Sequence, residues 1–182
     1  MNFEIIKASN TKTTTWSGGT TSEIYIFPKG SDFQKRDFLF RLSVATVELE
    51  ESTFTSLPEV NRTLMVLKGN LHLKHEGQHE SHLNEFQQDS FKGEWTTKSV
   101  GKVTDFNLMC KGDTTGELKH IHLVKSQEFE LSATKELFYV IEGEFTFEGE
   151  RLEKGDLLIF ENKKQKIELF SKNADLIWIR IN

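Results

Sequence analysis

Apolar and polar residues alternate with a period of two along short segments of the chain, and turn residues separate these segments. A period of two places successive side chains on opposite faces of a β-strand, whereas a helix needs apolar residues three or four positions apart. The windows compatible with a helix, such as residues 81–88, lack a sustained apolar stripe. The pattern therefore predicts an all-β sandwich or barrel. The predicted strands are Glu23–Phe27, Phe38–Leu49, Arg62–Leu67, Asn70–His75, Thr104–Cys110, His120–Lys125, Leu137–Ile141, Glu144–Glu148, Asp156–Phe160, Gln165–Phe170 and Leu176–Ile181.

The two halves of the chain repeat one arrangement of strand and hairpin. In the first half an apolar strand ends at Gly69 and a hairpin follows, and in the second half the same order occurs around Gly143. A polar, glycine-containing segment at residues 111–117 separates the halves. We therefore expect an N-terminal domain of residues 1–112 and a C-terminal domain of residues 117–182.

The second hairpin leads into a turn with the sequence Leu152-Glu-Lys-Gly-Asp156 and then into an apolar strand. Glycine permits the positive φ of a tight turn, and aspartate hydrogen-bonds to nearby backbone. The series of hairpin, turn and returning strand resembles the cupin pattern. Together with the repeat, this resemblance implies two tandem cupin (RmlC-like jelly-roll) barrels, an arrangement called a bicupin.

Neither half carries the metal-binding pattern of cupin enzymes. Metal-dependent cupins have a His-x-His pair and a glutamate just before the hairpin glycine, with a further histidine on a later strand, and this set leaves positions open around the ion. In the first half Arg62 stands at the glutamate position and residues 54–58 contain no histidine. In the second half Glu136 is suitably placed, but residues 128–132 contain no histidine and none follows Asp156. We expect no metal ion and no other cofactor.

The histidines elsewhere in the chain do not change this expectation. His120 and His122 share one face of a strand but lie too far before Gly143, so we interpret them as a solvent-facing pair. Four more histidines crowd one polar hairpin, and we interpret them as chance clustering at a solvated tip: His72, His75, His79 and His82.

Composition and charge narrow the partners and the compartment. The net charge of −5 and the lack of a basic cluster argue against nucleic acid as a partner. No apolar run approaches the roughly 20 residues that span a bilayer, so we expect no membrane partner. The single cysteine, Cys110, cannot form an internal disulfide, and the first residues do not resemble a signal peptide, so we expect a cytoplasmic protein. Cys110 lies beside no evident base, and we predict no catalytic residue.

Several short motifs in the first half resemble the HutD/Ves family of bicupins. They are residues 16–24 (WSGGTTSEI), residues 41–48 (RLSVATVE), Phe54 with Leu57-Pro58, Arg62-Thr63 with Leu67-Lys68-Gly69, and residues 105–109 (DFNLM). Five motifs in one order over roughly a hundred residues are specific. One difference affects function: the family's first motif often has an asparagine after the tryptophan, and Trp16 here is followed by Ser17-Gly18-Gly19. Any ligand contact of that asparagine is missing or replaced.

The same motifs contain the candidate ligand-binding residues. Strand alternation puts Arg41 and Ser43 on one face, and it puts Asp105 and Asn107 on one face of another strand. If these faces turn inward, the first barrel holds a polar cavity suited to a small anion, because guanidinium groups match carboxylates. Its predicted residues are Trp16 near the mouth, Glu23, Arg41, Ser43, Arg62, Asp105 and Asn107. If the faces turn outward, the same residues form surface ion pairs.

The resemblance implies a non-catalytic, metal-free binder of a small carboxylate with a regulatory role in histidine or glutamate catabolism. Formylated or formimino derivatives of glutamate, and urocanate, are the implied ligands. Two alternatives stay open: a cupin enzyme acting on a small polar acid, with Glu23 or Asp105 as acid or base, and a stress-related protein without catalysis. A homodimer is compatible with all three, because exposed edge strands often pair.

Overall fold

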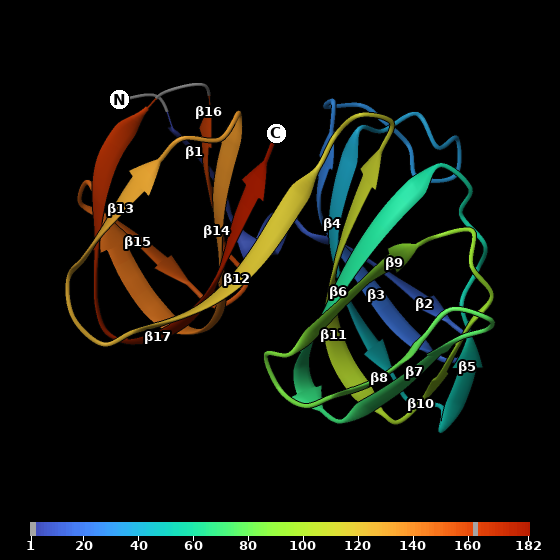
Figure 1. Ribbon diagram of the computed structural model, residues 1–182. Helices are drawn as coiled ribbons and strands as arrows, with labels where there is room; N and C mark the ends of the chain where they lie inside the picture. The colour runs from blue at the N-terminus through green and yellow to red at the C-terminus, as the bar shows by residue number, and fades with distance from the viewer. Residues whose placement is uncertain (1–2, 162–163) are drawn as a thin grey trace. The chain divides into compact units, whose positions relative to one another are not determined.

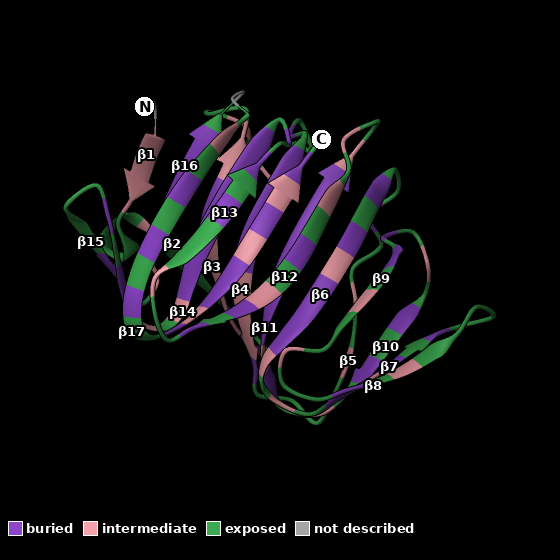
Figure 2. Ribbon diagram, turned by 60° about the vertical axis from the view of Figure 1, so that its left-hand side comes forward, coloured by how far each residue is buried: buried purple, intermediate pink, exposed green. Residues whose placement is uncertain are grey.

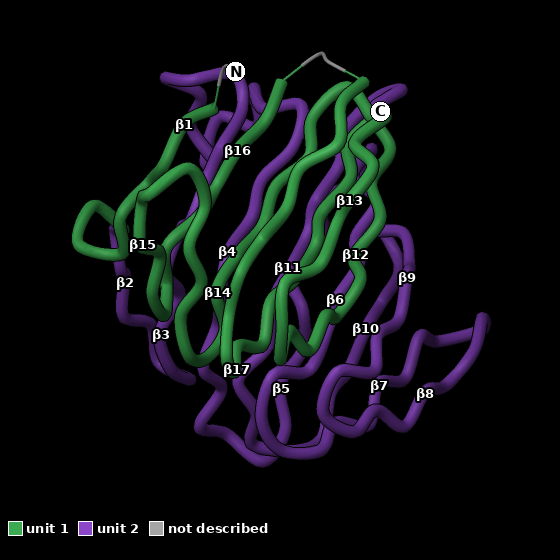
Figure 3. The backbone as a smooth tube through the Cα atoms, turned by 90° about the vertical axis from the view of Figure 1, so that its left-hand side faces the viewer, with its two compact units in different colours: residues 1–11, 115–182 green, residues 12–114 purple. Residues whose placement is uncertain are grey.

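The computed structural model describes residues 3–161 and 164–182, whose regular structure is almost entirely β-strand (Figure 1). The predicted all-β class is confirmed, and the described residues include only one short 3-10 helix, Ala8–Asn10. Two compact units divide the chain, and Figure 3 colours them separately. We call residues 12–114 the central unit, and residues 3–11 with 115–182 the terminal unit. No helix among the described residues has the length and apolar character needed to cross a bilayer.

The N-terminal segment belongs to the terminal unit, whereas the sequence analysis placed it in a domain of residues 1–112. Strand β1 (Phe3–Ile6) pairs antiparallel with β16 (Leu157–Glu161). The Asp156 carboxylate accepts hydrogen bonds from the Lys7 ammonium group and the Ala8 backbone N–H, each at 2.8 Å. The sequence shows Asp156 only as a turn residue, because its partners lie almost the whole chain away. Residues 3–11 therefore extend the terminal sheet.

Two sheets and the apolar residues between them make up the central unit. One sheet has the order β2-β3-β4-β11-β6-β9 and the other the order β5-β10-β7-β8. Apolar residues from strands of both sheets form one buried cluster, among them Val47, Leu64 and Leu73. The strands are β2 (Lys12–Trp16), β3 (Gly19–Phe27), β4 (Phe40–Val47), β5 (Glu51–Thr53), β6 (Val60–Gly69), β7 (Leu71–His75), β8 (Glu80–Leu83), β9 (Gln88–Lys92), β10 (Thr97–Val100) and β11 (Val103–Lys111).

The terminal unit is built around two long strands, β14 and β17. Its sheet has the order β1-β16-β14-β17-β12, with β13 paired to β17 and β15 paired to β14. Figure 2 shows buried and exposed bands alternating along β17, as the period-two pattern predicts. Its core combines aliphatic side chains with several aromatic rings, including Phe129, Phe138 and Phe145. The remaining strands are β12 (Gly116–Leu123), β13 (Gln127–Leu131), β14 (Lys135–Phe147), β15 (Glu150–Glu153) and β17 (Gln165–Ile181).

The repeated glycines mark corners, where the chain leaves one set of strand partners for another. Gly69 has a φ of 92° and ends β6, and the next strand, β7, belongs to the other sheet. Gly143 has a φ of 76° and lies inside β14, which joins the two predicted strands 137–141 and 144–148. A Cβ on Gly143 would lie 2.2 Å from the Asn173 carbonyl oxygen, so the close crossing of β17 needs glycine here. The predicted strands 165–170 and 176–181 likewise form one strand, β17.

Candidate functional site

Three neighbouring strands of the central unit bring distant polar residues together. Strands β4, β11 and β6 lie side by side (Figure 1), and Met109 on β11 pairs with Arg41 on β4 and with Arg62 on β6. Two residues further along both strands, Asn107 on β11 pairs with Ser43 on β4. Because paired residues project from the same face of a sheet, all these side chains share one face. Residues that are about 20 to 65 positions apart in sequence thus meet there.

A pocket of about 310 Å³ opens on this face. The structure therefore excludes the outward orientation that the sequence left open, since the side chains of Arg41, Arg62 and Asp105 are all buried. Glu23 lies outside the lining but contacts Arg41. Their role in ligand binding stays a prediction. Of the predicted site residues, those that line the pocket are Trp16, Arg41, Ser43, Arg62, Asp105 and Asn107.

Arg41 is held by partners on two sides. Its Nε donates to Glu23 Oε2 at 2.7 Å, and a terminal nitrogen donates to Ser43 Oγ at 3.1 Å. The guanidinium carbon also lies 4.3 Å from the centre of the Phe33 ring, a cation–π contact. These contacts keep the guanidinium plane in one orientation beside the pocket.

Arg62 is buried to a similar extent but is less completely paired. One terminal nitrogen donates to Asn107 Oδ1 at 2.8 Å, and the guanidinium carbon lies 4.7 Å from the Phe54 ring centre. Its Nε has no hydrogen-bond partner among the described residues. Burial lowers the pKa of Arg62 to about 10, so the side chain still carries its charge at neutral pH. A buried cation with an unused donor is costly, and an anionic ligand would complete its pairing.

Asp105 supplies the titratable group of the pocket. Burial raises its pKa to about 7, although the charge of Arg62 and a hydrogen bond from Asn107 Nδ2 both favour the ionised form. Near neutral pH the carboxyl group therefore exists in both protonation states. When it is protonated, the two arginines face only one carboxylate, that of Glu23. The pocket then carries a net positive charge that suits an anion.

The donor set of the pocket does not fit a transition-metal ion. Two guanidinium groups and an amide surround a single carboxyl group, and arginine offers no lone pair to a cation. The residues that the sequence analysis missed are the aromatic walls, especially Phe33, which lies between β3 and β4. The residues around Phe33 show no strand-like alternation, so the sequence offered no reason to place Phe33 at the pocket.

Two other features of the sequence have structural explanations. His120 Nε2 and His122 Nδ1 both contact Asp175 Oδ1, at 2.8 and 3.0 Å, so the pair is tied to β17. Cys110 is buried, and burial raises the pKa of its thiol to about 12. That value leaves almost no thiolate at neutral pH, which argues against a nucleophile.

Comparison with known proteins identifies the family. The HutD family model matches residues 8–178. The chain belongs to the HutD family. Among solved structures, HutD from Pseudomonas fluorescens SBW25 (formate condition) superimposes with a TM-score of 0.80 at 22% identity, covering 100% of this chain and 98% of that one. The conserved protein of unknown function PA5104 from Pseudomonas aeruginosa PAO1 gives 0.85 at 21% identity, with both chains fully covered. A search of curated proteins found no match.

More distant structures confirm the fold of this HutD-family chain. The bacterial pirin YhhW from Escherichia coli, solved in complex with nickel(II), matches with a TM-score of 0.74 at 11% identity over 98% of each chain. Oxalate decarboxylase of Bacillus subtilis matches at 0.67 with 7% identity, over 97% of this chain and 76% of its own. These are cupin-fold proteins, so the predicted tandem cupin, jelly-roll architecture is confirmed.

Proposed function

We propose that the central unit binds a small carboxylate in the pocket between Arg41 and Arg62, and that binding serves a regulatory role without catalysis or metal. The observation that carries this proposal is the buried Arg62 guanidinium: Arg62 lines the pocket, and its Nε has no hydrogen-bond partner among the described residues. Arginine presents its donors as a planar fork that matches a carboxylate. The lone cysteine is compatible with the cytoplasmic location that this role requires.

The size and polarity of the pocket favour an amino-acid-derived acid. A volume of about 310 Å³ is at the lower end of small-molecule sites, which suits a metabolite better than a peptide. Arg41 and Arg62 flank Met109 in one row of the sheet, so a ligand with two carboxylates can meet both. The Asn107 amide and the Ser43 hydroxyl add hydrogen-bonding groups for an amide or imine. With the HutD name of its relative, these features favour N-formyl or formimino derivatives of glutamate, or urocanate.

Thermal melting with a panel of acids tests the proposal. Glutarate, N-formylglutamate and urocanate are compared with the uncharged glutaramide. A ligand at 100 times its Kd adds about 2.7 kcal/mol, which raises the Tm of the unit that binds it by several degrees. Arg62→Met should abolish the shift. Arg180→Met is the matched control, because Arg180 in the terminal unit also has an Nε without a hydrogen-bond partner among the described residues and lies beside a ring, that of Trp178. Absence of a shift from every acid, or a full shift in Arg62→Met, would overturn the proposal.

A second candidate function rests on Asp105. A carboxyl group with a pKa of about 7 in a pocket is suited to general acid or base catalysis. Proton NMR of each stabilising acid, incubated with the protein for hours, separates the two functions. A binder leaves the acid unchanged. Conversion that Asp105→Asn abolishes, while binding is retained, would favour the enzyme.

A further inference from the structure

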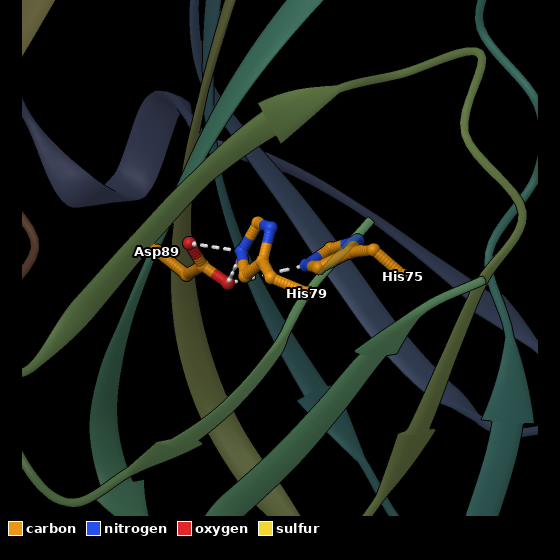
Figure 4. A group of neighbouring side chains, drawn as sticks. All are labelled: His75, His79 and Asp89. Atoms are coloured by element: carbon orange, nitrogen blue, oxygen red, sulfur yellow. Dashed lines mark hydrogen bonds and ion pairs between the residues drawn. The ribbon is translucent and has the colours of Figure 1, made fainter. Parts of the chain in front are cut away.

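Two histidines and an aspartate converge at the edge of the four-stranded sheet of the central unit. His75 ends β7, His79 lies in the turn before β8, and Asp89 belongs to β9 (Figure 4). The His75 backbone N–H donates to the His79 carbonyl oxygen at 2.9 Å, so the hairpin holds the two histidines in register. The sequence analysis interpreted these histidines as chance clustering. Asp89, from another sheet, is the partner that the sequence did not reveal.

One ring nitrogen of each histidine points at the Asp89 carboxylate (Figure 4). His75 Nε2 lies 3.1 Å from Asp89 Oδ2, and His79 Nε2 lies 3.0 Å from the same oxygen. One ligand atom from each residue lies within 4.8 Å of the others. With metal–ligand bonds of about 2.0–2.1 Å, neighbouring ligand atoms are about 3.0 Å apart at a 90° angle and about 3.3 Å apart in a tetrahedron. The two nitrogen–oxygen distances therefore already lie in the range of neighbouring metal ligands.

Thr97 orients the buried histidine as a supporting residue does at a metal site. Thr97 Oγ1 lies 2.8 Å from His75 Nδ1 and donates to the Trp95 carbonyl oxygen at 3.3 Å. The hydroxyl has one hydrogen, so when it donates that hydrogen to Trp95 it accepts a hydrogen bond from His75 Nδ1–H. In the neutral ring the lone pair of Nε2 then faces Asp89, a repulsive contact that either a proton on Nε2 or a metal ion between the two atoms relieves. In metal sites the histidine usually binds the ion through one ring nitrogen and donates a hydrogen bond from the other, which fixes the orientation of the ring.

The surroundings combine an apolar wall with access from solvent. The Phe91 and Trp95 rings lie with their centres 4.5 and 5.8 Å from that of His75. The His75 side chain is fully buried and that of Asp89 is 11% exposed, whereas that of His79 is 40% exposed. An ion can thus enter past His79 and be held against the buried pair. The Ser81 hydroxyl also hydrogen-bonds to Asp89, which fixes the carboxylate.

We propose that His75, His79 and Asp89 bind one divalent first-row transition ion of the zinc type. Imidazole and carboxylate ligands suit this class, and three protein ligands leave at least one position open to water or another ligand. The site shares no ligand with the arginine pocket, so the two proposals stand or fall separately.

Metal titration of EDTA-stripped protein tests the site. Isothermal titration with Zn²⁺ should show one equivalent bound, and Co²⁺ should give a visible d–d absorption band. His79→Gln and Asp89→Asn should each weaken Zn²⁺ binding at least tenfold, and Thr97→Val, which removes only the support, should weaken it about 10- to 100-fold. His79 is partly exposed, so its variant should fold, and circular dichroism checks this.

His72→Gln is the matched control, because His72 lies on the same hairpin but pairs with Glu80 at 3.1 Å. This variant should bind Zn²⁺ as the unchanged protein does. A protein that takes up no stoichiometric Zn²⁺ overturns the proposal. So does a folded His79→Gln variant with undiminished affinity, or equal losses in His72→Gln and His79→Gln.

Discussion

Replacing Asp105 by asparagine should remove the pH dependence of carboxylate binding to the central unit. The Asp105 pKa of about 7 is about three units above the usual value of 3.8. Three units correspond to roughly 4 kcal/mol that disfavour the ionised form in this pocket. A bound carboxylate adds a second negative charge beside Asp105, so the complex binds a proton even more firmly. Binding of the acid should therefore be accompanied by proton uptake.

The expected size follows from the fraction of protonated Asp105 in the free protein. The ligand's own carboxyl groups, with pKa values near 4, stay ionised above pH 6. If the complex is fully protonated at Asp105, the affinity rises about 30-fold between pH 8.5 and pH 6 and becomes level below a pH of about 7. The same raised pKa affects folding: its stabilising contribution is complete below pH 4 and is lost as the pH rises through about 7. Asp105→Asn should remove both dependences.

Isothermal titration with N-formylglutamate from pH 6 to pH 8.5 measures this effect. Repeating it in buffers of different ionisation enthalpy gives the number of protons taken up. The affinity of Asp105→Asn should vary less than about threefold over this range. Asp175→Asn, in the terminal unit, is the control and should keep the slope. If Asp105→Asn kept the slope as well, the titrating group would lie elsewhere and the reasoning from burial would be refuted.

Three shorter predictions concern stability and reactivity. Gly143→Ala should lower the unfolding free energy by at least about 2 kcal/mol in urea titrations, whereas Gly149→Ala, at a φ of 81° with open space around it, should cost about 1 kcal/mol. The pKa of Asp156 is lowered overall. Burial alone would raise it, but the hydrogen bonds that the carboxylate accepts have the larger combined effect. Its stabilisation is therefore present above pH 4 and lost as the pH falls further, so Asp156→Asn should cost about 1–3 kcal/mol at pH 7 and progressively less as the pH falls below 4. Cys110 should react with a thiol reagent only after unfolding, as a colour assay can show.

The strands that the sequence predicted are those with an apolar face. Strands β4, β6 and β11 match their predicted ranges to within two residues at most of their ends, because each alternates apolar residues over a long stretch. Two of the missed strands, β2 and β5, have few apolar residues and lie at the sheet edges. These segments form strands because an adjacent strand of the sheet supplies hydrogen-bond partners. The alternation of residues within the segment itself carries no information about that adjacent strand.

Alternation alone could not decide which way the site residues point. It places Arg41 and Ser43 opposite Leu42, but all three are buried, so both faces of β4 are covered. The usual inference that polar faces turn to water therefore fails on this strand. The orientation comes from the packing of the two sheets: Val47 and Leu64 fill one end of the inner face, and Arg41 and Arg62 lie at the other.

The two units differ at the position that stands seven residues before the corner glycine. This position is Arg62 in the central unit and Glu136 in the terminal unit, and both side chains are buried. Glu136 Oε1 accepts the backbone N–H groups of Ser132 and Ala133 at 2.8 and 2.9 Å, and Oε2 accepts the Trp178 indole N–H at 2.6 Å. The terminal unit thus satisfies its buried charge internally. Arg62 lines a pocket, and its buried Nε has no hydrogen-bond partner among the described residues.

This difference predicts opposite costs for removing the two charges. Glu136→Gln should destabilise the protein by about 2–4 kcal/mol in urea titrations at pH 6, because an amide N–H2 would face the indole N–H and leave buried donors without acceptors. Arg62→Met should change stability by no more than about 1 kcal/mol, since removal of a buried, incompletely paired charge offsets the lost bond to Asn107. A charge kept for binding can be lost without unfolding the protein, whereas a structural one cannot. The opposite ranking, with Arg62→Met the more damaging variant, would make Arg62 a structural residue and leave the pocket without its ligand anchor.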